Sequence, residues 1–188
     1  MQNYELVLVL NAWTSDKERE KLIKDFESGI EKNIIEKDEI WMLTTAYLLK
    51  WKKDFNKAYY VSYYLKAEPV DLLKIKESLL FNKGISRYTI FKMNKQQIFF
   101  HFEKLQSELN DIISSWDEKK TWQKVSFFMN LKNKKYINWK SFPMLKKYVT
   151  RFWDIKPRKY TKNSVVVQKA LRTEIFRARE LWVLEYIK

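Results

Sequence analysis

The sequence predicts an α+β protein, with a four-stranded antiparallel sheet and two helices in its first half and a small basic helical region in its second half. The first observation is that apolar segments in residues 1–95 follow the order βαββαβ. The second is a helical periodicity that begins after residue 96. The third is charge: residues 119–188 hold 19 Lys or Arg and 4 Asp or Glu, whereas residues 1–100 hold 17 and 14. The two halves are therefore expected to differ in fold and in partner.

The first strand and the first helix are predicted within residues 4–30. Residues 4–10 (YELVLVL) are β-branched and aliphatic, which is typical of a strand buried on both faces or nearly so. Thr14 or Ser15 can cap the next segment, in which Leu22, Phe26 and Ile30 recur at helical spacing. An amphipathic helix is therefore expected to follow the strand.

The rest of the sheet is predicted from residues 34–93. Strands are expected over 34–49 and 57–68, with an exposed loop at 50–56 between them. Pro69 opens the second helix, because proline is favoured in a first turn. Asn82, Lys83 and Gly84 indicate a turn, and residues 85–93 form the last strand. This order predicts a ferredoxin-like βαββαβ sheet with both helices on one face.

A connector helix is predicted after the sheet. Apolar residues between 98 and 116 step by three and four, which indicates one stripe of a long helix starting at Gln96. We therefore assign a ferredoxin-like domain to residues 1–95, a connector helix to 96–122 and a basic helical domain to 123–188.

The basic domain is predicted to contain two helices and a loop. Residues 119–141 are expected to be extended in part, and a short helix over 144–153 follows Pro143. Residues 154–163 are predicted to form a basic loop, because Lys156 precedes Pro157 and is pushed out of the helical region. Asn163 or Ser164 can cap a final helix that continues to about residue 184.

The final helix is predicted to be amphipathic, with its cations beside its apolar face. At 100° per residue, Lys169, Arg172 and Arg179 share one arc with Phe176, while Arg177 projects elsewhere. The arginines thus border the core-facing stripe and do not occupy it. That stripe consists of Val167, Leu171, Ile175, Ala178 and Trp182.

The positive charge of the second half predicts a polyanionic partner, either nucleic acid or an acidic membrane face. A solvated basic face is the plain alternative. RNA is favoured because a basic loop leads straight into a basic helix. A membrane is disfavoured because the apolar arc is narrow and is needed for the fold. The residues predicted to contact phosphate are Arg158, Lys159, Lys162, Lys169, Arg172, Arg177 and Arg179.

Composition argues against catalysis, cofactors and metals. The chain has no cysteine and a single histidine, His101, which excludes thiolate sites and histidine clusters. Its two glycines, Gly29 and Gly84, are too far apart for a phosphate-binding loop. We expect no enzyme activity, no cofactor and no metal. The lack of cysteine also favours a reducing compartment such as the cytoplasm, and no apolar run reaches the ~20 residues of a membrane span.

Residues 155–186 (IKPRKYTKNSVVVQKALRTEIFRARELWVLEY) resemble the bacterial small-subunit ribosomal protein S18 family, and residues 137–149 (INWKSFPMLKKYV) are similar to another of its segments. The family has glycine after the loop threonine, where this chain has Lys162. If that position needs a positive φ, lysine there costs on the order of 1 kcal/mol. Some members hold zinc through cysteines, which this chain lacks, so the resemblance implies no zinc here. The family positions are filled by Pro157, Lys159, Thr161, Gln168, Lys169, Leu171, Ile175, Arg177, Ala178, Arg179, Leu181 and Tyr186.

Residues 1–93 resemble the partner family, ribosomal protein S6. The two resemblances together imply a fused pair that binds the platform of the small subunit, on the central domain of its rRNA, among neighbouring ribosomal proteins. They imply that the halves pair through the sheet edge and the aromatics of strands two and three, in a bacterial cytoplasmic ribosome in preference to an organelle ribosome. The matching residues are Tyr4, Glu5, Trp41, Ala46, Tyr47, Lys57, Ala58, Tyr60, Phe81, Asn82, Ile85 and Arg87.

An RRM-like protein that binds single-stranded RNA outside the ribosome is the alternative function. It has the same βαββαβ order and stacks bases on strand aromatics. The basic-Gly-aromatic-Gly segment of that family is missing, however, and adjacent tyrosines must face opposite sides of a strand. The aromatics available for stacking would be Tyr59, Tyr60, Tyr63, Tyr64, Tyr88 and Phe91.

Overall fold

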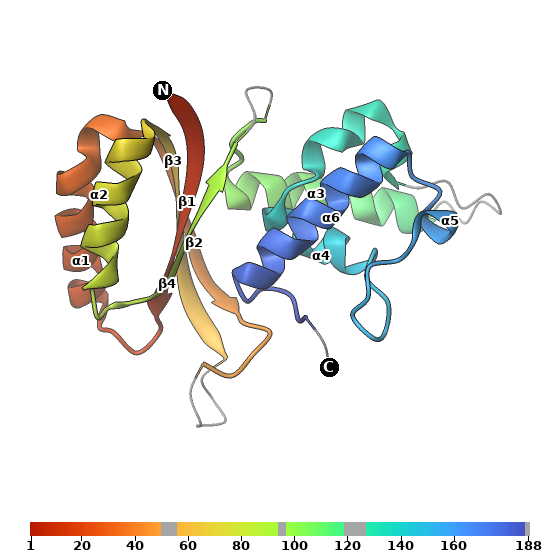
Figure 1. The fold of residues 1–188 in the computed structure, drawn as a ribbon. Helices are drawn as coiled ribbons and strands as arrows, with labels where there is room; N and C mark the ends of the chain where they lie inside the picture. The colour runs from red at the N-terminus through yellow and green to blue at the C-terminus, as the bar shows by residue number, and fades with distance from the viewer. Residues whose placement is uncertain (50–55, 94–96, 119–126, 187–188) are drawn as a thin grey trace. The chain divides into compact units, whose positions relative to one another are not determined.

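The chain forms two units, Met1–Phe99 and Phe100–Lys188, in a computed structural model (Figure 1). The structure describes residues 1–49, 56–93, 97–118 and 127–186. Within this part of the chain, no helix has both the length and the apolar character needed to cross a membrane.

The first unit is built on a four-stranded sheet in the order β2-β3-β1-β4, with every neighbouring pair antiparallel. Its strands are β1 (Gln2–Asn11), β2 (Ile34–Thr44), β3 (Lys57–Ala67) and β4 (Ile85–Lys92). The predicted α+β fold with a four-stranded antiparallel sheet is confirmed. However, β2 ends at Thr44, before the predicted residue 49. Thr44 pairs with Lys57, the first residue of β3, and one further backbone hydrogen bond follows, from the Thr45 amide to the Asn56 carbonyl at 2.6 Å. The Thr45 hydroxyl then donates to the Tyr47 carbonyl. The loop predicted at 50–56 lies, apart from Asn56, outside the described residues.

Two helices, α1 (Asp16–Ile30) and α2 (Pro69–Leu80), cover one face of the sheet (Figure 1). Of the two predicted caps, Ser15 is the one that begins α1. Its hydroxyl accepts from the Glu18 amide while the Glu18 carboxylate accepts from the Ser15 amide. This reciprocal pair satisfies two amides that the first helical turn leaves free. Pro69 stands in the first turn of α2, as predicted.

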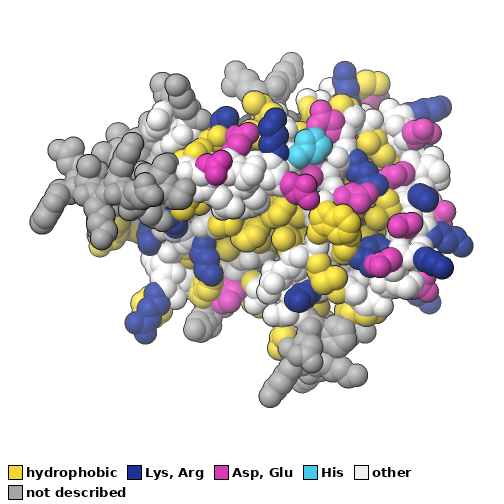
Figure 2. Space-filling model, turned by 180° about the vertical axis from the view of Figure 1, so that it is seen from behind, with side chains coloured by type: hydrophobic (Ala, Val, Ile, Leu, Met, Phe, Trp, Pro, Cys, Tyr) yellow, Lys and Arg dark blue, Asp and Glu magenta, His cyan; other side chains and the backbone are white. Residues whose placement is uncertain are grey.

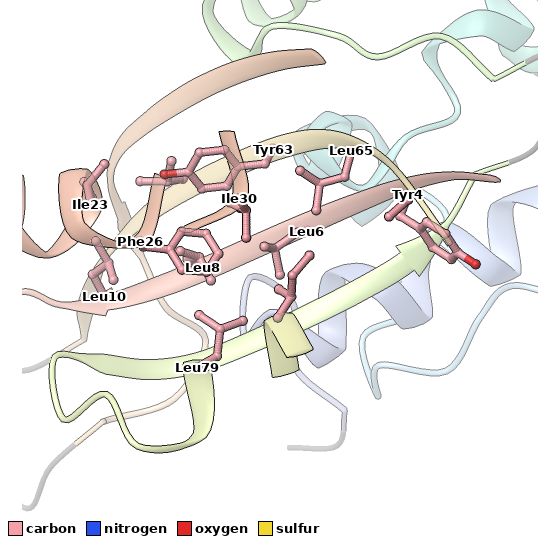
Figure 3. Close-up of a cluster of buried hydrophobic side chains, with 13 residues drawn as sticks. Tyr4, Leu6, Leu8, Leu10, Ile23, Phe26, Ile30, Tyr63, Leu65 and Leu79 are labelled. Carbon is pink, nitrogen blue, oxygen red and sulfur yellow. The ribbon is translucent and has the colours of Figure 1, made fainter. Parts of the chain in front are cut away.

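The core of the first unit lies between the helices and the sheet (Figure 3). The Phe26 and Tyr63 rings meet edge to face with centroids 5.8 Å apart. Burying one such aliphatic or aromatic side chain contributes about 1.5–3 kcal/mol relative to exposure. Tyr4, Leu6, Leu8, Leu10 and Leu65 reach this core from β1 and β3, and Ile23, Ile30 and Leu79 reach it from the helices.

The opposite face of the sheet is also apolar. Val7, Val9 and Tyr60 alternate with the residues of the helix-side core, so they point away from α1 and α2.

The charges of this unit are mixed, since acidic and basic side chains alternate over its helices, at the right of Figure 2.

The second unit begins with α3 (Phe102–Glu118), which starts six residues later than predicted. In the first backbone hydrogen bond of the helix, the Leu105 amide donates to the His101 carbonyl. The Phe100 carbonyl instead accepts from the Lys140 ammonium at 2.7 Å. This tertiary bond competes with an earlier helix start, and Ile98, predicted on the helical stripe, lies outside the helix and is exposed.

Short 3-10 turns follow where the sequence predicted partly extended chain. They are η2 (Phe127–Met129), η3 (Leu131–Tyr136) and η4 (Trp139–Ser141). Asparagine side chains hold them: Asn133 donates to the Phe127 carbonyl, and Asn138 accepts from the Lys140 amide. Such local side-chain bonds offer the backbone an alternative to strand pairing. Residues 119–126 lie outside the described part.

The prediction of a helix over 144–153 is wrong beyond its first turn, because α4 spans Phe142–Lys146. The chain then turns, and Val149 pairs with Ile155 in an isolated bridge. The predicted loop contains one helical turn, α5 (Arg158–Thr161), and Lys156 is non-helical as predicted. The final helix, α6 (Val165–Glu180), ends before the predicted residue 184. Trp182 has φ 62°, and the amides of residues 183 and 184 both donate to the Ala178 carbonyl, which turns the chain out of the helix.

The core of the second unit forms where α6 contacts α4 and η4, and where α3 contacts η4. Trp139 is fully buried at its centre. Four residues of the predicted α6 stripe are buried, but Trp182 is only half-buried because it follows the helix end. The buried four are Val167, Leu171, Ile175 and Ala178.

Candidate nucleic-acid interface

The basic loop and α6 are held together by one side chain. Gln168 accepts from the Thr161 hydroxyl at 2.9 Å and donates to the Lys156 carbonyl at 2.9 Å. Ser164 is the helix cap, and its hydroxyl accepts from the Val167 amide. The segment between Lys156 and the start of the helix is therefore fixed in shape before any ligand arrives.

A left-handed residue lets the loop enter α6. Lys162 has φ 54° and ψ 18°, and its amide donates to the Arg158 carbonyl. The Arg158 side chain closes the same turn, because its Nε donates to the Asn163 carbonyl at 2.9 Å. The position at which the S18 pattern has glycine thus does require a positive φ here. A lysine in this conformation stores backbone strain of about 1 kcal/mol.

A groove of about 600 Å³ runs between this loop, α6 and the residues that follow α6. Five of its lining side chains are basic and one, Asp154, is acidic. Apolar aromatic surface lies among the cations: the Phe176 ring is 5.6 Å from the Arg172 guanidinium carbon and 5.4 Å from that of Arg179. The basic lining residues are Lys156, Arg158, Lys169, Arg172 and Arg179.

Three predicted contact residues are both in the groove and exposed, namely Arg158, Lys169 and Arg172. Guanidinium and ammonium groups displayed beside one another suit the phosphate oxygens of a nucleic-acid backbone. Lys159 and Lys162 are also exposed but are not part of the groove lining. They belong to α5 and its end, next to the groove residue Arg158.

Arg179 was predicted to border the core, but the structure shows that it is buried, with 6% of its surface exposed. Its guanidinium donates to the Glu185 carbonyl at 3.1 Å and also to the Trp153 carbonyl. It lies 5.5 Å from the Tyr186 ring as well. Arg179 therefore fastens the segment after α6 and the turn at residue 153 to the helix, and shapes the groove more than it faces into it.

Arg177 lies outside the groove lining. Its guanidinium pairs with Glu174 at 2.8 Å, and their side chains are 14% and 5% exposed. Glu174 accepts from the Trp139 amide as well, at 3.0 Å. The prediction from helical angle that Arg177 projects away from the other cations is confirmed, and its ionic partner connects α6 to η4.

Lys156 and Tyr186 line the groove but were not among the predicted contact residues. Lys156 precedes Pro157 and donates from its ammonium to the Lys147 carbonyl. Tyr186 reaches the groove only because the chain turns back after α6. For Lys156, its place in the basic loop was a usable signal. Nothing local in the sequence indicated the return of Tyr186.

The strand aromatics of the alternative function do not form a stacking surface. Tyr60 and Tyr63 are fully buried and Phe91 is 6% exposed. The Tyr64 ring stacks on Phe99 with centroids 5.6 Å apart. The remaining two, Tyr59 and Tyr88, pack against the helix-side core.

Both resemblances seen in the sequence are confirmed by comparison with known proteins. A family model described as ribosomal protein S6 matches residues 3–92, and one described as ribosomal protein S18 matches residues 133–184. The small ribosomal subunit proteins bS18 of Mycoplasma capricolum and Mycoplasma mycoides are each 38% identical over 65 residues, which cover 35% of this chain and 85% of each relative. A crystal structure of 30S ribosomal protein S6 from Thermotoga maritima is 20% identical, with a TM-score of 0.44 over 58% of this chain and 96% of that one. The chain therefore belongs, through its carboxy-terminal region, to the bS18 family of small ribosomal subunit proteins, fused to an amino-terminal region of the ribosomal protein S6 type.

Proposed function

We propose that this small-subunit ribosomal protein binds the central domain of small-subunit rRNA, at the platform, through the groove beside α6. The observation that carries the proposal is the groove itself, with five basic side chains around an aromatic wall and a loop fixed by Gln168. Both matched families are structural ribosomal proteins, so the chain is not an enzyme.

The phosphate backbone supplies the affinity in this proposal. Each lysine or arginine that neutralises a phosphate releases condensed counterions, so affinity falls steeply with salt. Arg177 and Arg179 shape the protein surface, since both are largely buried in contacts with their own chain. The residues left to contact phosphate are Arg158, Lys159, Lys162, Lys169 and Arg172.

The first experiment measures binding of the full chain to transcribed small-subunit rRNA between 50 and 200 mM salt. Five phosphate contacts predict a loss of about 500-fold over this range. Arg172→Gln is expected to weaken binding and to lower the slope of log affinity against log salt by about 1. Lys21→Gln, which removes an exposed charge from α1, is the matched control and should leave the slope unchanged.

A nearly flat salt response, or an equal effect of the two substitutions, would contradict the assigned groove. Assembly is checked separately by cosedimentation of the chain with small subunits in salt-washed gradients. We propose that this subunit belongs to a bacterial cytoplasmic ribosome, and absence of the chain from those fractions would refute its assembly there.

We further propose that the two halves pair within one chain. The argument rests on the apolar sheet face that carries Val7, Val9 and Tyr60, which α1 and α2 do not cover. A sheet face of this kind needs an apolar cover in water. A covalent connection also raises the concentration of each half around the other, to the millimolar range for a short linker. Neighbouring ribosomal proteins are expected to contact the remaining surface.

A further inference from the structure

A rigid hairpin turn, residues 150–154, stands between α4 and the basic loop. Its ends are joined by the Val149–Ile155 bridge and by the Thr150 amide, which donates to the Asp154 carbonyl at 2.7 Å. The Thr150 hydroxyl accepts from the Phe152 amide at 3.2 Å and from the Asp154 amide at 3.1 Å. One threonine side chain thus fixes the backbone on both sides of the tip. The turn is preorganised and does not need a partner to acquire its shape.

The turn is also fastened to the candidate interface. Arg179 of α6 donates to the Trp153 carbonyl, and Asp154 and Ile155 line the groove. Trp153 has φ 67°, a left-handed conformation that is unusual for a bulky residue. Strain of this kind, of order 1–3 kcal/mol, persists only where surrounding contacts enforce it, and it tends to gather at functional sites.

The tip of this turn presents an aromatic ring to solvent. Phe152 is 71% exposed, and the guanidinium carbon of the exposed Arg151 lies 5.6 Å from its ring centroid. A single exposed apolar residue needs no explanation by itself. Here the ring is held at the tip of an ordered turn beside a cation, in the half of the chain that carries the excess positive charge.

We propose that Phe152 stacks on an unpaired base of the small-subunit rRNA while Arg151 contacts a neighbouring phosphate. The inference rests on the proposed rRNA binding and adds a second kind of contact to it. A flat ring with an adjacent guanidinium matches the two parts of one nucleotide, an aromatic base and an anionic backbone. Lys146 and Lys147, which precede the turn, are exposed as well, so the surroundings favour an anionic partner over a neutral protein surface.

The test compares Phe152→Leu with wild type in the binding of the full chain to transcribed small-subunit rRNA. Leucine keeps an apolar side chain but removes the flat ring, so affinity should fall about 5- to 150-fold. The slope against salt should stay unchanged, because stacking releases no counterions. Phe152→Trp should retain the affinity. Phe81→Leu, at a ring that is 87% exposed after α2, is the matched control and should have no effect.

Arg151→Gln provides the complementary result, a slope lowered by about 1 with a smaller loss of affinity at high salt. Thermal unfolding of the Phe152 variants should match wild type, since the side chain is exposed. Affinity of Phe152→Leu within twofold of wild type would overturn the inference. So would unchanged rRNA binding combined with poorer incorporation into subunits, which would assign Phe152 to a protein contact. Failure of wild type itself to bind rRNA would instead refute the proposed function.

Discussion

Lys162 combines an exposed positive charge with a strained backbone conformation. Its φ of 54° lies in the left-handed region, where residues other than Gly, Asn and Asp are disfavoured. Its side chain is exposed beside the other loop cations. The S18 pattern has glycine at this position, and the observed backbone angle is one that glycine adopts without strain. We infer that the charge is retained for RNA while the backbone is not optimal.

Lys162→Gly is expected to raise the free energy of unfolding by about 1 kcal/mol, because glycine adopts this conformation without steric penalty. The same substitution should lower the salt slope of rRNA binding by about 1, since one phosphate contact is lost. Urea denaturation of the full chain checks the first effect. Lys159→Gly, three residues earlier in α5, is the control and should destabilise by roughly 0.5–1 kcal/mol. A Lys162→Gly chain that unfolds at lower urea than wild type would show that the lysine side chain itself stabilises the turn.

At the scale of elements, the sequence predicted those parts whose pattern is local. The strands and α1 follow from short apolar and β-branched runs, from helical spacing and from the Ser15 cap. The second unit was harder because contacts distant in sequence decide it. Lys140 takes the Phe100 carbonyl away from α3, and Thr150 turns the chain where a helix was predicted to continue. Helical angles placed the α6 cations on the correct arc, but they could not show that Arg179 is buried, since its acceptors follow from the turns at residues 153 and 182.

The connection between α3 and η3 is expected to depend on pH. The Tyr136 hydroxyl donates to Glu108 at 2.8 Å, and this bond lowers the pKa of the Glu108 carboxyl. A carboxyl whose folded pKa is lowered stabilises the fold above its unfolded value of 4.5, and that contribution is lost as pH falls through the lowered folded pKa. The protection factors of the amides in residues 102–113 and 133–136, which are corrected for the intrinsic pH dependence of exchange, should therefore fall below about pH 4.5. Glu108→Gln should remove this step, and an acid response identical to wild type would refute the assignment.

The whole molecule joins two halves that match different protein families and that differ in charge. Its net charge is +14, and the acidic and basic residues of the first 100 positions nearly balance. The excess therefore belongs to the half that carries the groove. We propose that the basic half contacts RNA and that the apolar sheet face of the other half is the surface for pairing. The pairing of the halves is the proposal that has to be tested on the intact chain.

Leu8→Ala tests that pairing. It opens a cavity in the helix-side core and is expected to lower the free energy of unfolding by about 2–5 kcal/mol. If the halves stabilise one another, amide exchange should accelerate in α6 as well as in β1. Leu171→Ala, in the core of the second unit, should have the reciprocal effect on β1. Acceleration confined to the mutated unit in both variants would show that the halves are independent and would refute pairing within one chain.

The left-handed residues also bear on how this sequence can change over generations. Trp153, Lys162 and Trp182 all have a positive φ, while the whole chain contains only two glycines. At each of these positions, a single substitution to glycine would remove the backbone strain. Trp153 and Trp182 are half-buried, so glycine there would also lose packing, whereas the Lys162 side chain is exposed. A lineage adapting to a warmer habitat would therefore gain stability from glycine at position 162 before either core needed to be repacked, and orthologues from hotter environments should carry glycine there.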